Sequence, residues 1–342
     1  MAVLTLSCSQ DGVLTGADEH GVLNAVQEQG GDAAILSEKL QLSMSSDAGA
    51  EKRASDDVGL GLQERMTAIN EALAAAGYAV RVQKAELSLA DNAPADAAAV
   101  VFANDRRLRL TSRWVPGDTR READGNNITY LADQTFRMAN GASGPINSEP
   151  AVDTAFGTWD GVTCSNLDIV KRADTEPNPN FILALFGLAD INTAEPFAAD
   201  ITTTGFLPGF VFDLLAEDGS QFILGVTWTL VFVTDDEPTD VDNNGFADTG
   251  LKEIWYNNAF TWTDTGQGGT DIETVALHEN GHAVELGHFG RVHATFSPHG
   301  GRLHVSPRAV MNAFILGTLR QTLGTDVAAY CGIFGAWPTP HS

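Results

Sequence analysis

The stretch that most constrains the fold of this chain lies between residues 270 and 288, where histidines recur at short spacing. His278 and His282 are four residues apart, so on an α-helix both imidazoles project from one face, about one turn apart. Thr270, followed three residues later by Glu273, forms a capping-box pattern that predicts the start of this helix. The sequence therefore predicts a helix that holds two metal ligands on one face.

His288 supplies a third imidazole if the chain turns sharply after the helix, and Gly287 is expected to make the turn because glycine tolerates the left-handed backbone conformation. Three neutral imidazoles suit Zn²⁺ and leave a coordination position open, which is typical of catalytic zinc. Glu279 follows the first histidine, where its carboxylate can act as a general base on water. The alternative is a helix that carries solvated histidines.

The pattern His278-Glu279-x-x-His282 followed by His288 resembles the metzincin clan of zinc peptidases, and its bacterial matrixin-like branch. Those enzymes carry a methionine in a tight turn beneath the zinc, and Met311 fits that position. Residues 155–159 and 323–335 resemble the first and the closing helix of such a domain. The resemblance implies an α+β zincin catalytic domain over residues 128–342, with helices, a mixed and mostly parallel twisted sheet, and an active-site helix that carries HExxH.

The same resemblance implies a zinc-dependent endopeptidase that acts on polypeptide substrates, with Glu279 as general base and acid. The clan usually has glycine where Glu285 stands, so we expect the helix to run slightly longer and to break at Gly287. One alternative is a non-catalytic zinc-binding or adhesion module that kept the fold, although such a module does not need Glu279. A hydrolase of non-peptide amides is another.

A second candidate metal site is a loop whose oxygen-bearing residues stand at positions 1, 3, 5 and 9, namely Asp240, Asp242, Asn244 and Asp248. Gly245 at position 6 completes the front of an EF-hand-like calcium loop. The bidentate glutamate expected at position 12 is missing, because Leu251 stands there. We expect either a structural Ca²⁺ site or an acidic surface turn.

The chain has 45 acidic and 20 basic residues among 342, a formal net charge of −25. Such a surface repels nucleic acid and anionic membranes. A transmembrane helix is not expected, because no run of 18 apolar residues occurs.

The three cysteines show no CxxC pair, so a cysteine zinc site is not expected. Cys164 and Cys331 could form a disulfide in an oxidising compartment, which would leave Cys8 over. Residues 1–8 resemble the end of a bacterial lipoprotein signal, in which Cys8 would carry a lipid anchor; an ordinary chain terminus is the alternative. Together with the peptidase resemblance, these features predict a monomer that is secreted or held at the cell surface.

Upstream of the catalytic range, residues 1–58 are rich in Gly, Ser, Asp, Glu and Ala and predict a flexible region. Residues 59–115 predict a small α/β unit, with a helix over 63–76 and strands over 78–87 and 98–110. This unit is too small to be stable alone, so we expect it to dock on the catalytic domain, either as a prosegment that inhibits by occlusion or as an accessory domain. Further elements are a helix over 149–162 and strands over 223–233 and 254–260.

Overall fold

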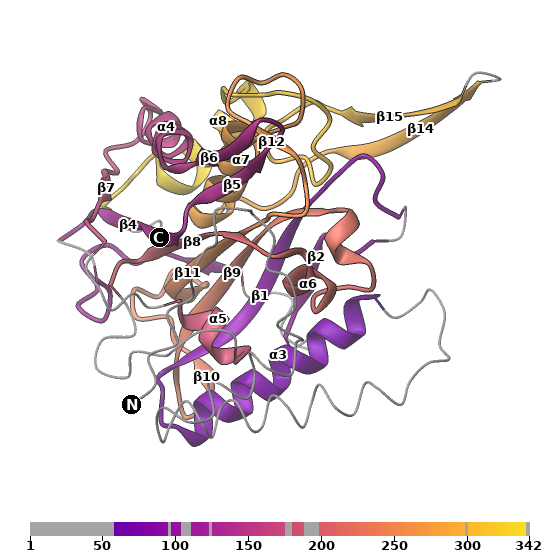
Figure 1. Cartoon of the computed structure of the whole chain (residues 1–342). Coiled ribbons are helices and arrows are strands. Elements are labelled where there is room, and N and C mark those ends of the chain that lie inside the picture. The colour runs from indigo at the N-terminus through magenta and orange to yellow at the C-terminus, as the bar shows by residue number, and fades with distance from the viewer. Residues whose placement is uncertain are drawn as a thin grey trace.

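The computed structural model describes residues 58–94, 97–103, 111–122, 125–174, 180–187, 198–297 and 300–339. At its centre is a mixed sheet (Figure 1). Its strands are, in spatial order, β2 (Val100–Phe102), β1 (Val80–Leu89), β9 (Ile223–Thr234), β11 (Ala247–Asn257), β8 (Ile201–Leu207), β4 (Ile128–Phe136) and β7 (Ile169–Lys171), with β10 (Glu237–Pro238) beside β9 and β3 (Ser112–Arg113) beside β11. The pairs from β11 to β7 are parallel, whereas those from β11 to β2 are antiparallel.

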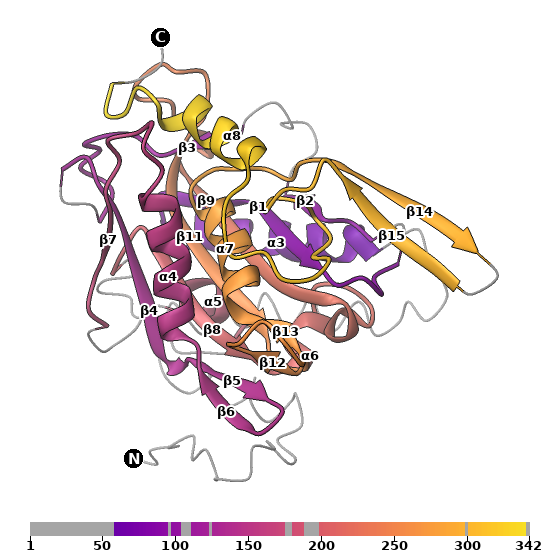
Figure 2. The same cartoon turned by 90° about the horizontal axis from the view of Figure 1, so that it is seen from above.

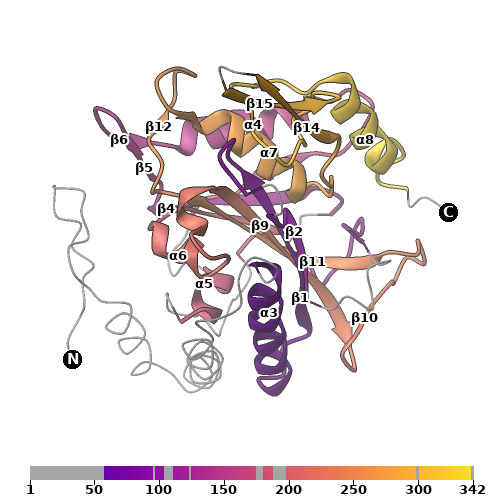
Figure 3. The same cartoon turned by 90° about the vertical axis from the view of Figure 1, so that its right-hand side faces the viewer.

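Helices cover both faces of this sheet (Figure 3). One face carries α4 (Glu149–Asp160), α7 (Ile272–Ala283) and α8 (Gly324–Phe334), and the other carries α3 (Val58–Ala75), α5 (Phe181–Leu185) and α6 (Gly209–Asp213), which a short 3-10 turn, η2 (Gly219–Gln221), follows. Each helix layer encloses its own hydrophobic core. The chain is therefore a mixed α/β protein built in three layers, which is compatible with the α+β class expected from the sequence.

Two smaller β-structures lie outside the main sheet. A four-stranded sheet joins β13 (Thr270–Asp271), β12 (Trp262–Thr263), β5 (Met138–Gly141) and β6 (Gly144–Asn147). A hairpin of β14 (Arg291–Ser297) and β15 (Gly300–Ser306) projects from the body (Figure 1). This hairpin separates His288 from Met311 in the sequence.

Local sequence patterns account for several of these elements. The β-branched run expected at 223–233 is β9, which is buried along almost its whole length because helices cover both sheet faces. The predicted helix over 149–162 is α4, and its apolar face is buried. The strand expected over 254–260 is the second half of the longer β11, which ends at Asn257.

The helix and first strand predicted within residues 59–115 are α3 and β1, and they join the main sheet. β1 pairs with β9 from Val80, opposite Phe232, to Leu89, opposite Ile223. Apolar residues of α3 and β1 share one core with those of β9 and β11. Of the strand expected over 98–110, β2 covers three residues, while 104–110 lie outside the described residues, as do residues 1–57 with Cys8.

Cys164 and Cys331 form a disulfide with a Cα–Cα distance of 5.8 Å, which joins the loop after α4 to α8. Among the described residues, no helix combines the length and the apolar character needed to cross a membrane.

Candidate metal centre

Helix α7 carries two of the three predicted ligands, His278 and His282, and lies beside α4 (Figure 2). Its N-cap is Asp271, whose Oδ1 accepts a hydrogen bond of 2.9 Å from Thr274 N, whereas Thr270 lies in strand β13. The predicted Thr270 capping box is therefore wrong by one residue, because the side chain that accepts from the first turn of the helix is that of Asp271, the last residue of β13. Trp159 of α4 donates from Nε1 to the Leu277 carbonyl at 2.9 Å and so fixes the two helices together.

The turn after α7 also differs from the prediction. The helix ends at Ala283, and the left-handed residue is Glu285, with φ of 69°, while Gly287 does not adopt a positive φ. The Glu285 carboxylate is buried and forms an ion pair of 3.0 Å with Lys252 Nζ. Lys252 Nζ also donates to the His282 carbonyl at 2.6 Å, at the carboxyl end of α7. Tertiary contacts thus hold a side chain at a position where local propensity favours glycine.

This turn brings the three predicted histidines together. Their Nε2 atoms are 3.0 Å apart between His278 and His282, 3.1 Å between His282 and His288, and 3.2 Å between His278 and His288. Two nitrogens bound to one Zn²⁺ at about 2.0–2.1 Å in tetrahedral geometry lie roughly 3.3 Å apart. The spacing of the donor atoms therefore fits a single zinc ion.

The hydrogen bonds of the other ring nitrogen, Nδ1, define the tautomers of His278 and His282. Nδ1 of His278 lies 2.7 Å from the Val310 carbonyl, and Nδ1 of His282 lies 2.7 Å from the Leu286 carbonyl. A carbonyl only accepts, so both Nδ1 atoms carry the proton and both Nε2 atoms present lone pairs. Burial lowers the pKa of His278 to about 4 and the pKa of His282 well below its usual range, so both rings are neutral at pH 7. Two lone pairs that face each other at 3.0 Å repel unless a cation lies between them, and the donor set fits a metal.

The predicted base, Glu279, is fully buried and faces the sheet. Its Oε1 accepts a hydrogen bond of 2.5 Å from Ser88 of β1, and its Oε2 accepts one of 2.7 Å from Thr227 of β9. A Cβ at Gly225 would lie 2.8 Å from Oε1, so glycine is needed beside this carboxylate. Burial raises the pKa of Glu279 to about 8, and the two hydroxyl donors lower it in part.

The methionine predicted beneath the metal is fully buried next to α7. Met311 packs so tightly on the helix that a Cβ at Gly281 would overlap its Sδ. The backbone amides of Val310 and Met311 donate to the two oxygens of Asp326, on the first turn of α8, at 3.0 and 3.2 Å. The same turn supplies the carbonyl that accepts from His278, so Asp326 positions this ligand through the backbone.

Sequence reasoning missed the contribution of β1. Lys84, Glu86 and Ser88 lie on the strand face that points to α7, and all three are buried. Glu86 Oε1 is 3.4 Å from His282 Nδ1, and Glu86 pairs with Lys84 at 2.7 Å. The signal available in the sequence was the alternation of polar residues in a strand that is otherwise apolar, which also describes a strand with one solvated face.

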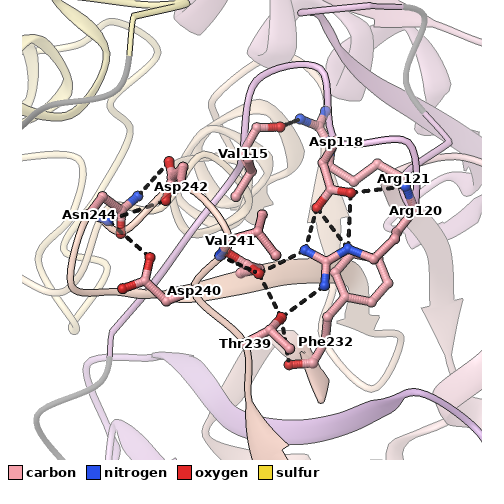
Figure 4. Close-up of polar contacts among 11 residues, drawn as sticks. Val115, Asp118, Arg120, Arg121, Phe232, Thr239, Asp240, Val241, Asp242 and Asn244 are labelled. Atoms are coloured by element: carbon pink, nitrogen blue, oxygen red, sulfur yellow. Dashed lines mark hydrogen bonds and ion pairs between the residues drawn. The ribbon is translucent and has the colours of Figure 1, made fainter. Parts of the chain in front are cut away.

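The predicted calcium loop brings three carboxylates to within 4.8 Å of one another, those of Asp240, Asp242 and Asp248. Arg120, however, donates to Asp248 Oδ2 at 2.7 Å. Asp240 accepts from the backbone amides of Asn244 and Gly245 in its own loop, and Figure 4 shows it beside Asn244. The side-chain oxygen of Asn244 accepts from Phe246 N at 2.8 Å. The four predicted ligands thus lie together, but several of their side-chain oxygens already accept hydrogen bonds from protein groups.

Neither a protein-family model nor a curated protein sequence matches this chain. The structure itself therefore carries the argument: an α/β fold with a cluster of three histidines on and after helix α7, of which His278 and His282 are buried and His288 is partly exposed.

Proposed function

We propose that this protein is a zinc-dependent endopeptidase that hydrolyses peptide bonds in polypeptide substrates. The observation that carries the proposal is the convergence of three Nε2 atoms at 3.0–3.2 Å, two of them oriented by carbonyls that fix the proton on Nδ1. A carboxylate directly follows the first of these histidines in the sequence.

His278, His282 and His288 would hold the zinc through Nε2. Zinc bound by three imidazoles lowers the pKa of a water towards about 7 and polarises a carbonyl. Glu279 would accept the proton of the attacking water and deliver it to the leaving amine. Asp326 and the Val310 carbonyl would keep the His278 ring in the tautomer that binds metal.

The matrixin-like metzincin fold is part of the proposal. It is supported by the HExxH helix α7, by the tight packing of Met311 on Gly281, and by helices α4 and α8 at the two stretches that resemble that clan. A secreted or cell-surface location, which the Cys164–Cys331 disulfide suits, remains our expectation, together with a monomeric state and a structural Ca²⁺ at the Asp240 loop.

A non-catalytic zinc module remains the second candidate because of one observation. Glu279 is fully buried, and hydroxyls of Ser88 and Thr227 occupy both of its oxygens. A carboxylate held in this way contributes to packing as well as to chemistry.

The test is zinc content and casein cleavage measured on the same preparations, with a chelator control. Glu279→Ala should keep about one zinc per chain and lose cleavage by about 10²-fold or more, because it removes the general base. The control Glu217→Ala removes an exposed glutamate and should change neither quantity. His282→Ala should lose the zinc. Cleavage by Glu279→Ala at the wild-type rate would refute the proposed mechanism.

A further inference from the structure

The carboxyl end of β1 is held on both sides by backbone hydrogen bonds. On one side β1 is antiparallel to β9, with Leu89 opposite Ile223. On the other side Leu89 N donates to the Ala313 carbonyl at 2.8 Å, and Ile315 N donates to the Leu89 carbonyl at 2.9 Å, which makes a parallel bridge. Farther back along β1, from Lys84 to Glu86, its neighbour on this second side is β2. Strand β9 on one side, and β2 with residues 313–315 on the other, thus form a seat one strand wide, and β1 fills it.

Within this seat β1 touches the catalytic groups of the proposed peptidase. Ser88 Oγ donates to Glu279 at 2.5 Å, and Glu86 lies 3.4 Å from the ring of His282. With β1 in place, Glu279 has no solvent-exposed surface, and neither has His278 or His282. A polypeptide in solution therefore has no path to Glu279 along β9 while β1 is present.

The opposite side of β1 explains why the seat stays filled. The pairing of β1 with β9 shifts register between Val82 and Lys84. Before this bulge the even-numbered residues of β1 face the α3 core, and after it the odd-numbered residues do. Val82, Leu87 and Leu89 are buried in that core. The strand is also held by α3, because the side-chain amide of Asn70 exchanges two hydrogen bonds, of 2.7 and 2.8 Å, with the backbone of Val82.

We propose that β1 is an internal closing strand, which occupies the seat where an extended polypeptide has to lie for its backbone to reach Glu279 and the histidines. The inference rests on the proposed peptidase function. The described structure is then the closed form, and a polypeptide binds only after β1 leaves the seat. Because the seat offers backbone donors and acceptors from β9 and residues 313–315, the ligand it takes is an extended peptide chain.

A reversible lock tests this directly. Leu87 and Val226 are direct cross-strand partners that both face the α3 core, away from Glu279. Opposite residues of antiparallel strands lie about 4.5–5.5 Å apart at Cα, which a disulfide can bridge. The zinc-loaded L87C/V226C protein should therefore cleave casein about tenfold more slowly, or worse, when oxidised than when reduced, because the open population is removed. Single L87C, taken through the same redox steps, controls for effects on Cys164–Cys331.

A loosening variant provides the opposite perturbation. Asn70→Ala removes the two hydrogen bonds to Val82 and should raise both the hydrogen exchange of residues 80–89 and the cleavage rate by about fivefold to tenfold. Asn92→Ala is the matched control, because Asn92 also donates its side-chain amide to a backbone carbonyl, that of Gln221 at 3.0 Å, outside β1. This control should leave both readouts unchanged.

The outcomes separate the closing strand from the peptidase activity. If the oxidised lock cleaves casein as fast as the reduced protein, the closing strand is refuted and the peptidase proposal stands. If no form cleaves although zinc is bound, the peptidase proposal fails, and binding of a labelled, unstructured casein peptide decides the rest. Tighter binding to Asn70→Ala than to the oxidised lock would support the closing strand, and equal binding would refute it.

Discussion

Glu285 offers a test of which force sets the turn after the metal-binding helix. Replacing it by glycine relieves a left-handed backbone, which costs a non-glycine residue roughly 1–2 kcal/mol. The same change leaves Lys252 buried without its carboxylate, and breaking a buried ion pair costs about 3–5 kcal/mol. The Thr249 hydroxyl also loses its acceptor, at 2.6 Å. We therefore expect Glu285→Gly to destabilise the metal-free protein by about 2–4 kcal/mol, although it installs the residue that backbone propensity favours.

The assay is urea unfolding followed by tryptophan fluorescence, with a chelator present so that metal binding does not add to stability. Lys252→Met alone should also destabilise, because it leaves the Glu285 carboxylate unpaired. The double variant Glu285→Gly/Lys252→Met should recover most of the loss, since it removes both buried charges. A Glu285→Gly protein as stable as the wild type, or losses that simply add in the double variant, would refute the view that the ion pair holds the turn.

Two further predictions concern packing and pH. Gly281→Ala should destabilise the folded protein by about 2 kcal/mol or more, because the added Cβ overlaps Met311. Gly157→Ala in α4, where a Cβ meets nothing within 4 Å, should instead stabilise it by about 0.5–1 kcal/mol. Thermal melts in which the two variants have the same melting temperature would contradict this. Burial raises the pKa of Glu253 from 4.5 to about 7, so between these pH values the folded state keeps a proton that the unfolded chain has released. The stability that the protonated Glu253 contributes to the folded state is therefore fully present below about pH 4.5 and is lost as the pH rises towards 7. The wild type should therefore lose about 2.5 kcal/mol relative to Glu253→Gln between pH 5 and pH 8 in urea unfolding, and a constant difference would show that Glu253 ionises normally.

Local periodicity was enough to predict the elements that hold the site. The spacing of His278 and His282 predicted a shared helix face, and the β-branched run at 223–233 predicted a strand buried on both sides. Both predictions depend on residues close together in the sequence, where the period of the pattern reflects the geometry of the element.

Features that depend on distant residues were not predictable in this way. The helix end was expected at Gly287, but Lys252, which lies on β11, stabilises the left-handed turn at Glu285. The pairing of Asp248, a possible calcium ligand, with Arg120 was likewise not predictable, because Arg120 comes from a segment more than a hundred residues earlier. The place of β1 beside β9 follows from strand pairing, for which the local sequence carries little information.

The disulfide divides the chain into two parts that differ in how they are tied. Cys164 and Cys331 close a covalent ring that contains β9, β11 and the whole of α7, so a single peptide-bond break inside this ring leaves both fragments attached to each other. Residues 58–103, which include β1, lie outside the ring and contain no cysteine. A single break between β2 and β3 would therefore leave this segment held by non-covalent contacts alone, free to dissociate while the histidine cluster stays enclosed within an intact ring.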